Sequence, residues 1–285
     1  MTKLEFLHKV TSRLRYKPIW MPILEASGQK IKNKNWIFIV GCYNSGTTLL
    51  DQILASHPEI SGLPDEGVML TNQLVRPEDF GWRRMWSECF DEMKNSKRNR
   101  NKNSYRIQKH WSHFYDLERN YLVEKSISNI TRIEFLNNNF KPNVFIHIVR
   151  NGYAVAEGIR RKSEIMHGNP YKEKEEYPIE LCAKQWIRSI ELFIETRKNL
   201  KNVIEISYEE LSEHPSQTVN KILDWLGVRR FSEEYFTHKF EIHEKKEKIK
   251  NMNLSSFKRL SDNDYEKINR VAQIYLEKYN YEILS

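Results

Sequence analysis

The sequence has few cysteines and no long hydrophobic run. Its three cysteines (Cys42, Cys89 and Cys182) are scattered and form no C-x-x-C pair. Neither a disulfide framework nor a cysteine zinc site is therefore expected. No apolar stretch approaches the roughly 18 residues of a membrane span, and the N-terminal residues lack the apolar core of a signal peptide. These absences predict a cytoplasmic protein with no membrane partner.

What is present is enough apolar sequence for a globular core, together with an excess of positive charge. Hydrophobic residues make up 39% of the 285 residues, and aromatic residues 12%. We expect one domain over residues 1–285. Lys and Arg exceed Asp and Glu by 46 − 38 = 8. A positive balance favours an anionic partner: a nucleotide, a nucleic acid or a membrane surface.

Apolar runs typical of buried strands alternate with amphipathic helical sequence. The runs "WIFIV", "NVFIHIV" and "NVIEIS" predict three strands, and helical patterns follow each of them. Such alternation predicts an α/β fold with a central, mostly parallel β-sheet flanked by helices. Residues 92–109 are polar, basic and rich in asparagine, and we expect a mobile basic loop there. An anion-binding arm and a plain solvated insertion are both open for it.

The loop that follows the first strand has almost the spacing of a Walker A motif. In "GCYNSGTT", Gly46 lets the backbone curl, so the N–H groups of residues 45–48 face outward at a helix N-terminus. That arrangement binds phosphate or sulfate. Thr47 stands where the Walker lysine belongs, and we see no strand ending in a carboxylate that would hold Mg²⁺. ATP hydrolysis is therefore disfavoured, and no metal is expected.

Polar residues follow each of the three predicted strands at its end. Residues 44–48 follow the first strand, Arg150 the second and Tyr208 the third. Ligands of parallel α/β sheets bind at the carboxyl ends of the strands. The sequence therefore predicts one shared site.

Five segments in order resemble the sulfotransferases that use 3′-phosphoadenosine 5′-phosphosulfate (PAPS), in particular the bacterial and tyrosylprotein-type branch. They are "IFIVGCYNSGTTLLDQILASHPEI", "EKSISNITRIEFL", "FIHIVRNGYAVAEGIRRK", "AKQWIRSIELF" and "ISYEELSEHP". The resemblance covers roughly residues 36–228 and, more faintly, "LSSFKRLS". It implies a P-loop-like nucleotide-binding sulfotransferase fold, PAPS as the donor and 3′-phosphoadenosine 5′-phosphate (PAP) as the product.

The resemblance also implies which residues bind the cofactor. The loop over residues 36–62 would hold the 5′-phosphosulfate, Arg150 would pair with the 3′-phosphate, and Tyr208 would lie beside the cofactor. A core role for Tyr208 is the alternative. A C-terminal segment over 241–261 would close the site. The remaining implied contacts are Asn44, Ser45, Gly46, Thr47, Thr48, Arg161, Lys162, Ser255, Lys258 and Arg259.

Two further residues match the family's catalytic positions. Lys125 in "VEKSIS" would neutralise charge on the leaving 5′-phosphate. Glu66 in "LPDEGVM" would take the proton of the attacking hydroxyl or amine. Asp65 is adjacent and stays open as the base, and His110 and His113 are weaker substitutes.

Two positions depart from the family pattern. Asn44 stands where the family often has a basic residue, and Gly158 stands where it commonly has a serine that binds the 3′-phosphate. Asn151, Arg160 or a backbone amide are candidates to compensate.

The expected function is sulfuryl transfer from PAPS to a hydroxyl or amine of a small-molecule acceptor, in specialised metabolism. A guanidinium alkaloid of the saxitoxin type would suit an acidic pocket of Asp65, Glu66 and Glu157. A protein-tyrosine sulfotransferase is the nearest alternative. From other classes, a degenerate P-loop kinase or NTPase and a nucleic-acid-binding module that uses the basic stretch 94–109 stay open.

Overall fold

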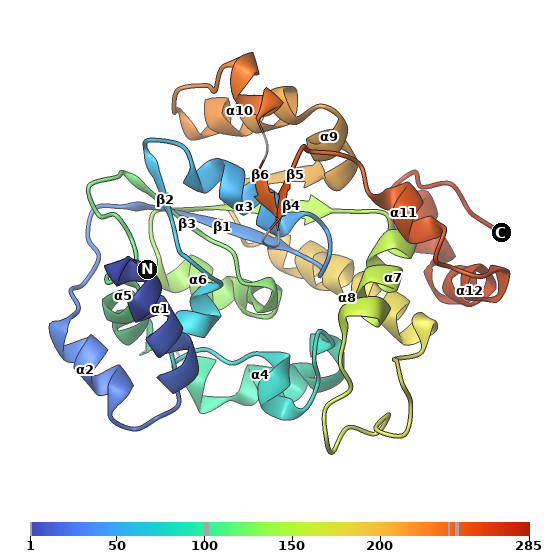
Figure 1. Ribbon diagram of the computed structural model, residues 1–285, viewed down its shortest axis with the longest axis horizontal. Helices are drawn as coiled ribbons and strands as arrows, with labels where there is room; N and C mark the ends of the chain where they lie inside the picture. Colours follow the sequence, from blue (N-terminus) through green and yellow to red (C-terminus); the bar gives the residue numbers. More distant parts are fainter. Residues whose placement is uncertain (1, 100–102, 239, 243–244) are drawn as a thin grey trace.

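A parallel sheet of five strands forms the centre of the computed structural model, which describes residues 2–99, 103–238, 240–242 and 245–285. The strands lie in the order β2–β3–β1–β4–β5, with β1 in the middle (Figure 1). Their bounds are β1 (Asn35–Gly41), β2 (Ile60–Gly62), β3 (Tyr121–Glu124), β4 (Asn143–Val149) and β5 (Val203–Ser207). The predicted α/β class is confirmed.

Strand β1 shows why the sheet needs cover on both faces. Trp36 and Phe38 belong to one buried apolar cluster, whereas Ile37 and Ile39 belong to a second cluster on the opposite face. Side chains alternate along a strand, so a run that is apolar at every position is buried on both sides. The continuous run "WIFIV" therefore specifies a central strand.

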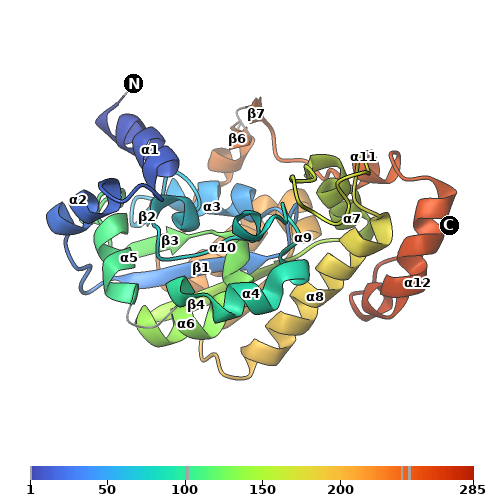
Figure 2. The same ribbon diagram turned by 90° about the horizontal axis from the view of Figure 1, so that it is seen from below.

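Helices cover the two faces of the sheet, as Figure 2 shows. Helices α3 and α10 contribute to the cluster around Ile37, and α5, α6, α7 and α8 contribute to the cluster around Phe38. Their bounds are α3 (Thr47–Ala55), α5 (Ser104–Trp111), α6 (Ile133–Asn139), α7 (Gly152–Lys162), α8 (Ile179–Arg197) and α10 (Pro215–Leu226). A shorter helix, α9 (Tyr208–Glu213), follows β5 directly.

The two ends of the chain add helices on opposite sides of the molecule (Figure 1). At the N-terminus, α1 (Lys3–Leu14) packs on the turn η1 (Gly67–Leu70), and α2 (Trp20–Ser27) packs on α5. Among the described residues, no helix has both the length and the apolar character to cross a membrane.

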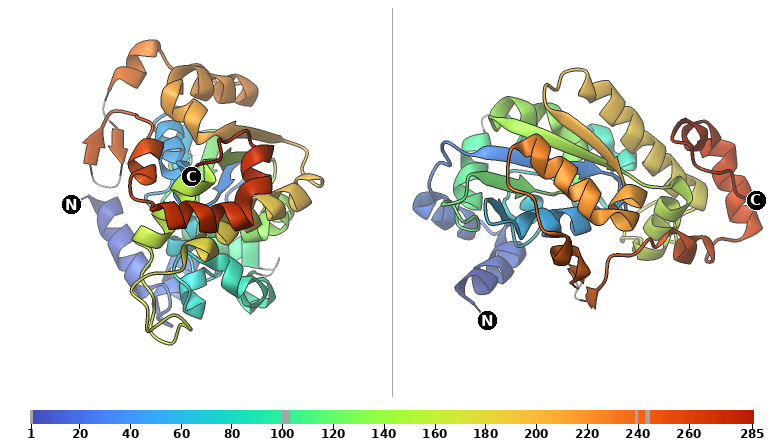
Figure 3. Two further views of the ribbon diagram at one scale, coloured as in Figure 1. Left: turned by 90° about the vertical axis from the view of Figure 1, so that its right-hand side faces the viewer. Right: turned by 90° about the horizontal axis from the view of Figure 1, so that it is seen from above.

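The C-terminal part returns to the sheet after a hairpin of β6 (Phe240–Ile242) and β7 (Lys245–Glu247). Helix α11 (Asn253–Phe257) packs on α7, and α12 (Asp262–Lys278) packs on α8 (Figure 3). Residues more than a hundred positions downstream of β4 thereby reach its carboxyl end.

The loop expected over residues 92–109 is shorter than predicted. Helix α4 (Phe90–Asn95) extends into it from one side and α5 from the other, with a 3₁₀ turn at Lys97–Asn99. Ile107 and Trp111 of α5 are fully buried. Several polar residues of this stretch, such as Glu92, Lys94 and Lys97, are exposed, whereas Asn103 and Gln108 are buried. Residues 100–102 lie outside the described part of the chain.

Candidate active site at the carboxyl edge of the sheet

All five strands of the sheet end in a segment that carries a residue predicted for the site. Glu66 follows β2, Lys125 follows β3, Arg150 follows β4, Tyr208 follows β5, and the loop from Cys42 to Gly46 follows β1. The order along the edge of the sheet sets their spacing. Neighbouring strands are about 4.8 Å apart, so Lys125 and Arg150 leave strands separated by about 10 Å, with the loop between them.

Gly46 shapes the loop after β1. Its φ of +90° is left-handed, and a Cβ there would lie 2.6 Å from Cδ2 of Tyr208. Only glycine fits both the backbone angle and the space. Helix α3 begins at the next residue, Thr47, so its first N–H groups, which have no partner within the helix, face the site. The Tyr208 ring thus packs against Gly46 and holds the loop in place.

Three side-chain donors around the loop are buried and have no hydrogen-bond partner among the described residues. They are Nδ2 of Asn44, Oγ of Ser45 and Nη2 of Arg150. Ser45 is fully buried, and Arg150 is 7% exposed. Buried donors are normally paired, because an unpaired one costs about 1–3 kcal/mol. Three such donors beside a helix N-terminus fit an anion such as a phosphate group.

Arg150 is held in place from both sides. Its Nη1 donates to the backbone O of Asn44 at 2.6 Å, and its Nε donates to Oδ1 of Asn253 at 2.8 Å. The guanidinium carbon lies 4.1 Å from the centre of the Tyr208 ring. Burial lowers the pKa of Arg150, although the group stays charged. One nitrogen, Nη2, is left to bind a ligand.

Asn253 is a contact that the sequence did not reveal. Besides its bond to Arg150, its Nδ2 donates to Oε1 of Glu209 at 2.6 Å. The hydroxyl of Tyr208 also meets this segment, donating to O of Lys250 and accepting from N of Met252, both at 3.1 Å. The neighbouring sequence "LSSFKRLS", which begins at Leu254, pointed to this segment but not to the asparagine before it.

The three residues predicted from the C-terminal segment behave differently. Ser255 is half-buried on α11, and Lys258 is exposed just after it. Arg259 donates to both carboxylate oxygens of Glu157, at 2.6 and 3.1 Å. The structure therefore brings Arg259 to α7 but leaves Lys258 in solvent.

Positive charge accumulates at the C-terminal end of α7. Burial, then the neighbouring guanidinium groups of Arg84 and Arg161, lowers the pKa of Lys162 to about 8. Arg161 donates to Oε1 of Glu157 at 2.6 Å. Neither Lys162 nor Arg84 has an ion pair with any residue that the structure describes. Among the described residues, Glu157 is the one carboxylate paired within this cluster, so its cations are in excess, and an excess of positive charge favours an anionic ligand.

Sequence reasoning missed Arg84. It lies in the connection before the buried residues Met85 and Trp86, with a left-handed φ of 62°. Its guanidinium carbon is 5.5 Å from the centre of the ring of Tyr43, which lies in the loop after β1. A non-glycine residue in this conformation is uncommon and often marks a functional site. No sequence motif signals it.

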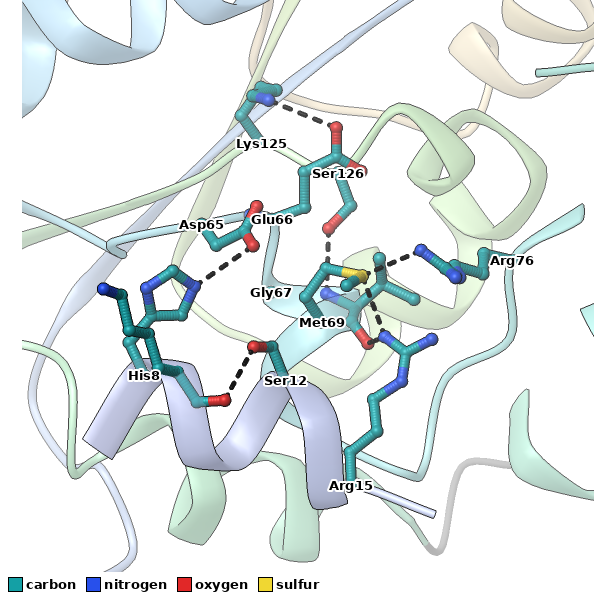
Figure 4. A network of polar contacts seen from close by, with 12 residues as sticks. His8, Ser12, Arg15, Asp65, Glu66, Gly67, Met69, Arg76, Lys125 and Ser126 are labelled. Atoms are coloured by element: carbon teal, nitrogen blue, oxygen red, sulfur yellow. Dashed lines mark hydrogen bonds and ion pairs between the residues drawn. The ribbon is translucent and has the colours of Figure 1, made fainter. Parts of the chain in front are cut away.

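Lys125 and Glu66 form an ion pair at the β2–β3 end of the site (Figure 4). Nζ of Lys125 lies 3.2 Å from Oε1 of Glu66, and their side chains are 10% and 29% exposed. Burial alone would lower the pKa of Lys125, but the carboxylates of Glu66 and Asp51 outweigh it, and the pKa is raised. Lys125 is therefore protonated at neutral pH.

Buried groups hold the segment that carries Glu66. Glu124, the last residue of β3, accepts from the backbone N of Gly67 at 2.9 Å and from the side chains of Ser126 and Asn129. Ser126 in turn accepts from N of Val68 at 3.1 Å. Strand β3 thus ends in a carboxylate that the sequence analysis did not identify. The Glu124 carboxylate is committed to this segment, and burial raises its pKa.

Helix α1 contacts the same segment from outside (Figure 4). Arg15, at the end of the helix, donates to O of Val68 at 2.8 Å and is 3% exposed. His8 lies 3.2 Å from Oδ2 of Asp65. Asp65 is thus paired with His8 of α1, whereas Glu66 is paired with Lys125 of the strand-end segment.

The two histidines considered as substitutes for Glu66 lie elsewhere. His110 is fully buried with Nδ1 2.8 Å from Oγ1 of Thr71, and burial lowers its pKa to about 3. Nε2 of His113 lies 2.8 Å from O of Leu24. Both are structural contacts of α5.

Asp51 is a second carboxyl group at the site that the sequence did not signal. It lies one turn into α3, after Thr47 and Thr48. Burial raises its pKa to about 7, and the nearby Lys125 opposes that rise. With Glu66 and Asp65, it makes the β2–β3 end of the site acidic.

Two other expectations about the site are corrected. Glu157 does not join Asp65 and Glu66 in an acidic pocket, because Arg161 and Arg259 hold its carboxylate on α7. Arg160 is not available to compensate for Gly158, because it forms two hydrogen bonds with Asp264, at 2.7 and 2.9 Å. Both groups are satisfied within the protein.

Comparisons with known proteins identify the family of the sequence and the fold of the chain. The sequence model of the sulfotransferase family matches residues 36–233. The chain is similar in fold to the sulfotransferase domain from the curacin biosynthetic pathway (21% identity, TM-score 0.56, covering 88% of this chain and 99% of that one). It is also similar to the sulfotransferase domain from the Synechococcus PCC 7002 olefin synthase (18% identity, TM-score 0.55, covering 90% of this chain and 100% of that one). A third similar structure is a sulfotransferase from Mycobacterium tuberculosis H37Rv (14% identity, TM-score 0.57, covering 94% of this chain and 83% of that one). A search of curated proteins gives no match.

Proposed function

The chain belongs to the sulfotransferase family, as an enzyme of the PAPS-dependent type, and from this premise we propose a role for each part of its site. The observation that carries the proposal is the order of groups along the sheet edge. Unpaired donors surround the loop after β1, the Lys125–Glu66 pair lies on one side, and Arg150 lies on the other. This order matches a nucleotide laid along the edge, with its reactive end towards β3.

The buried donors fit the anionic groups of PAPS. Ser45, the first amides of α3 and the hydroxyls of Thr47 and Thr48 would hold the 5′-phosphosulfate. Arg150 would bind the 3′-phosphate through Nη2, the one guanidinium nitrogen without a partner among the described residues. PAPS, when bound, supplies the sulfuryl group and leaves as PAP.

The acid–base work falls to the two residues at the β2–β3 end. Glu66 accepts the proton from the acceptor hydroxyl or amine on a carboxylate oxygen, which makes the acceptor a better nucleophile. Lys125, kept protonated by the surrounding carboxylates, places positive charge where the leaving phosphate gains negative charge. The buried bonds of Glu124 and Ser126 keep the Glu66 segment in register with Lys125.

We also propose that the acceptor is a small molecule, neutral or cationic, as a guanidinium alkaloid would be. Asp51, Asp65 and Glu66 place three carboxyl groups around Lys125. An anionic acceptor would be repelled by them, whereas a cation gains from them.

The test is transfer of labelled sulfate from PAPS to a panel of hydroxyl and amine acceptors. We expect Glu66→Gln to lower kcat by about 100-fold or more while it leaves PAP binding intact. Asp65→Asn, one residue away, is the matched control and should stay active. The reverse result would move the base role to Asp65. Within the panel, guanidinium-bearing alcohols should exceed their carboxylated analogues and tyrosyl peptides in kcat/KM.

Nucleotide binding provides a second, independent test of the proposal. PAP should raise the Tm of the protein, and ATP with Mg²⁺ should not. Equal shifts with PAP and AMP would contradict the role assigned to Arg150.

A further inference from the structure

Asn44 and Gly158 touch each other in the structure. Asn44 lies in the phosphosulfate loop with a left-handed φ of 61°. A Cβ at Gly158 would lie 2.8 Å from Cγ of Asn44 and 3.0 Å from its Nδ2. Real Cβ atoms do not approach that closely, so a side chain at position 158 would displace the amide. The glycine on α7 leaves the space that the asparagine side chain fills.

The amide that fills this space has an unused donor. Nδ2 of Asn44 is buried and has no acceptor among the residues that the structure describes. The backbone O of the same residue accepts from Nη1 of Arg150 at 2.6 Å, and Nη2 of Arg150 also lacks an acceptor. Two contacting residues thus each keep one free donor at the ends of β1 and β4. Paired placement of this kind indicates one acceptor group for both.

Other groups near Gly158 are less well placed for this role. Arg160 is committed to Asp264, and Asn151 caps the start of α7, about 10 Å along the helix from Gly158. Arg161 and Lys162 add positive charge at the end of α7, but the three atoms nearest to a Cβ at Gly158 all belong to Asn44. Asn44 is therefore the residue placed to replace a side chain at position 158.

We propose that Asn44 and Gly158 act as a pair, in which the Asn44 amide occupies the place of a residue-158 side chain and donates Nδ2–H to the 3′-phosphate that Arg150 binds. Asn44 then serves the 3′ side of the nucleotide, not the 5′-phosphosulfate side. The inference rests on the proposed function, because it presumes that PAP and PAPS bind along this edge.

Calorimetric titration with PAP and with AMP, which lacks the 3′-phosphate, tests the pair. Asn44→Gly removes the amide and suits the left-handed backbone, so it should weaken PAP binding by about tenfold or more and leave AMP binding unchanged. Asn44→Asp keeps the shape but turns the donor into an anion, and it should weaken PAP binding further. Asn33→Gly, at an exposed residue with φ 55°, is the matched control and should bind PAP as the unmodified protein does.

The partner position is tested by Gly158→Ser alone and together with Asn44→Gly. Alone, the serine should weaken PAP binding, because it displaces the amide. In the double variant, the serine has room, and we expect PAP binding to recover above that of Asn44→Gly. Additive losses in the double variant would overturn the pairing.

The outcomes distinguish a failure of the role proposed for Asn44 from a failure of the proposed sulfotransferase function. Full PAP affinity in Asn44→Asp, or equal losses for PAP and AMP in Asn44→Gly, would overturn the role of Asn44. If the unmodified protein does not prefer PAP to AMP, the proposed function itself fails. Asn44→Asp is nearly isosteric, so it provides an answer even where the glycine variant folds poorly.

Discussion

At the residue scale, Arg84 combines backbone strain with an unpaired charge. Its left-handed φ of 62° costs about 1 kcal/mol or more in a residue with a side chain. Burial lowers its pKa, and the neighbouring Arg83 acts in the same direction. Arg84 has no ion pair among the described residues, and its contact with the Tyr43 ring at 5.5 Å offsets these costs only in part. A ligand anion would offset them further, and we expect Arg84 to supply the charge that Asn44 lacks.

We expect Arg84→Ala to weaken PAPS binding by roughly tenfold, since it removes a partly buried cation near the loop. Arg84→Gly should weaken it equally but be about 1 kcal/mol more stable than the alanine variant, because glycine accepts the backbone angle. Titration of PAP and thermal unfolding measure the two effects. Arg83, which pairs with Glu164 in solvent, gives the control variant Arg83→Ala. Similar PAP affinities of the two alanine variants would contradict the role of Arg84.

Asp51 should make the stability of the free enzyme depend on pH. Its ordinary pKa is 3.8, and burial raises it to about 7 in the folded protein. Between these values the folded state keeps a proton that the unfolded state has lost. The contribution of Asp51 to the free energy of unfolding therefore falls as the pH rises from about 4 to 7 and levels off above 7.

Asp51→Asn cannot titrate, so its advantage in stability over the unmodified protein should widen from pH 4 to pH 7. The expected difference is on the order of 2 kcal/mol at neutral pH, after allowance for solvent screening. Chemical denaturation at several pH values measures it. A constant difference across this range would show that Asp51 does not titrate as described.

At the scale of elements, α1 acts as a support for the Glu66 segment, although it lies outside the matched family region. Arg15 closes the helix and donates to O of Val68, next to the segment that Glu124 and Ser126 hold from inside. The segment is therefore fixed between β3 and α1. A fixed base needs no ordering at the moment of reaction.

Arg15→Ala should lower kcat several-fold and the free energy of unfolding by about 1–3 kcal/mol, because a buried charged hydrogen bond is lost. PAP binding should stay unchanged, since the cofactor side lies beyond β1. Steady-state kinetics and PAP titration check both statements. Arg13→Ala, an exposed arginine on the same helix, is the control. A parallel loss of PAP affinity in Arg15→Ala would indicate general loosening instead.

The sequence predicted those helices and strands that are long enough to show a hydrophobic pattern. The long apolar runs of β1 and β4 predicted buried strands, and both are strands in the interior of the sheet. The three-residue β2 is too short to show a period, and it was missed. The helical start of α5 was missed because Ser104, Tyr105 and Arg106 are polar or exposed, and its apolar anchors Ile107 and Trp111 come late.

At the scale of the whole molecule, the site has a gradient of charge along the sheet edge. Carboxyl groups gather at the β2–β3 end around Lys125, and guanidinium groups gather at the β4 end around Arg150 and α7. The net charge of +8 does not show this division. It arises from strand order, which sets β2 and β3 on one side of β1 and β4 and β5 on the other.

Strand order also explains which site residues the sequence could predict. Residues within the loop or directly after a strand, such as Ser45, Lys125 and Arg150, carry a local signal. Arg84 and Asn253 have none, because only the folded chain brings them to the edge. The contact between Asn44 and Gly158 likewise joins positions more than a hundred residues apart.

Binding of PAP should protect the C-terminal segment around α11 and the loop after β1 from local opening at the same time. Asn253 holds Arg150, and the backbone at Lys250 and Met252 holds Tyr208, so opening of α11 would release both cofactor contacts. At a PAP concentration of about 100 times Kd, hydrogen exchange should slow by up to about 100-fold in both β1–α3 and α11. Helix α10, which packs on the sheet away from these contacts, should keep its rate. Asn253→Ala should uncouple α11, whose exchange would then no longer respond fully to PAP. Protection confined to residues 41–55 in the unmodified protein would show that the C-terminal segment does not close on the nucleotide.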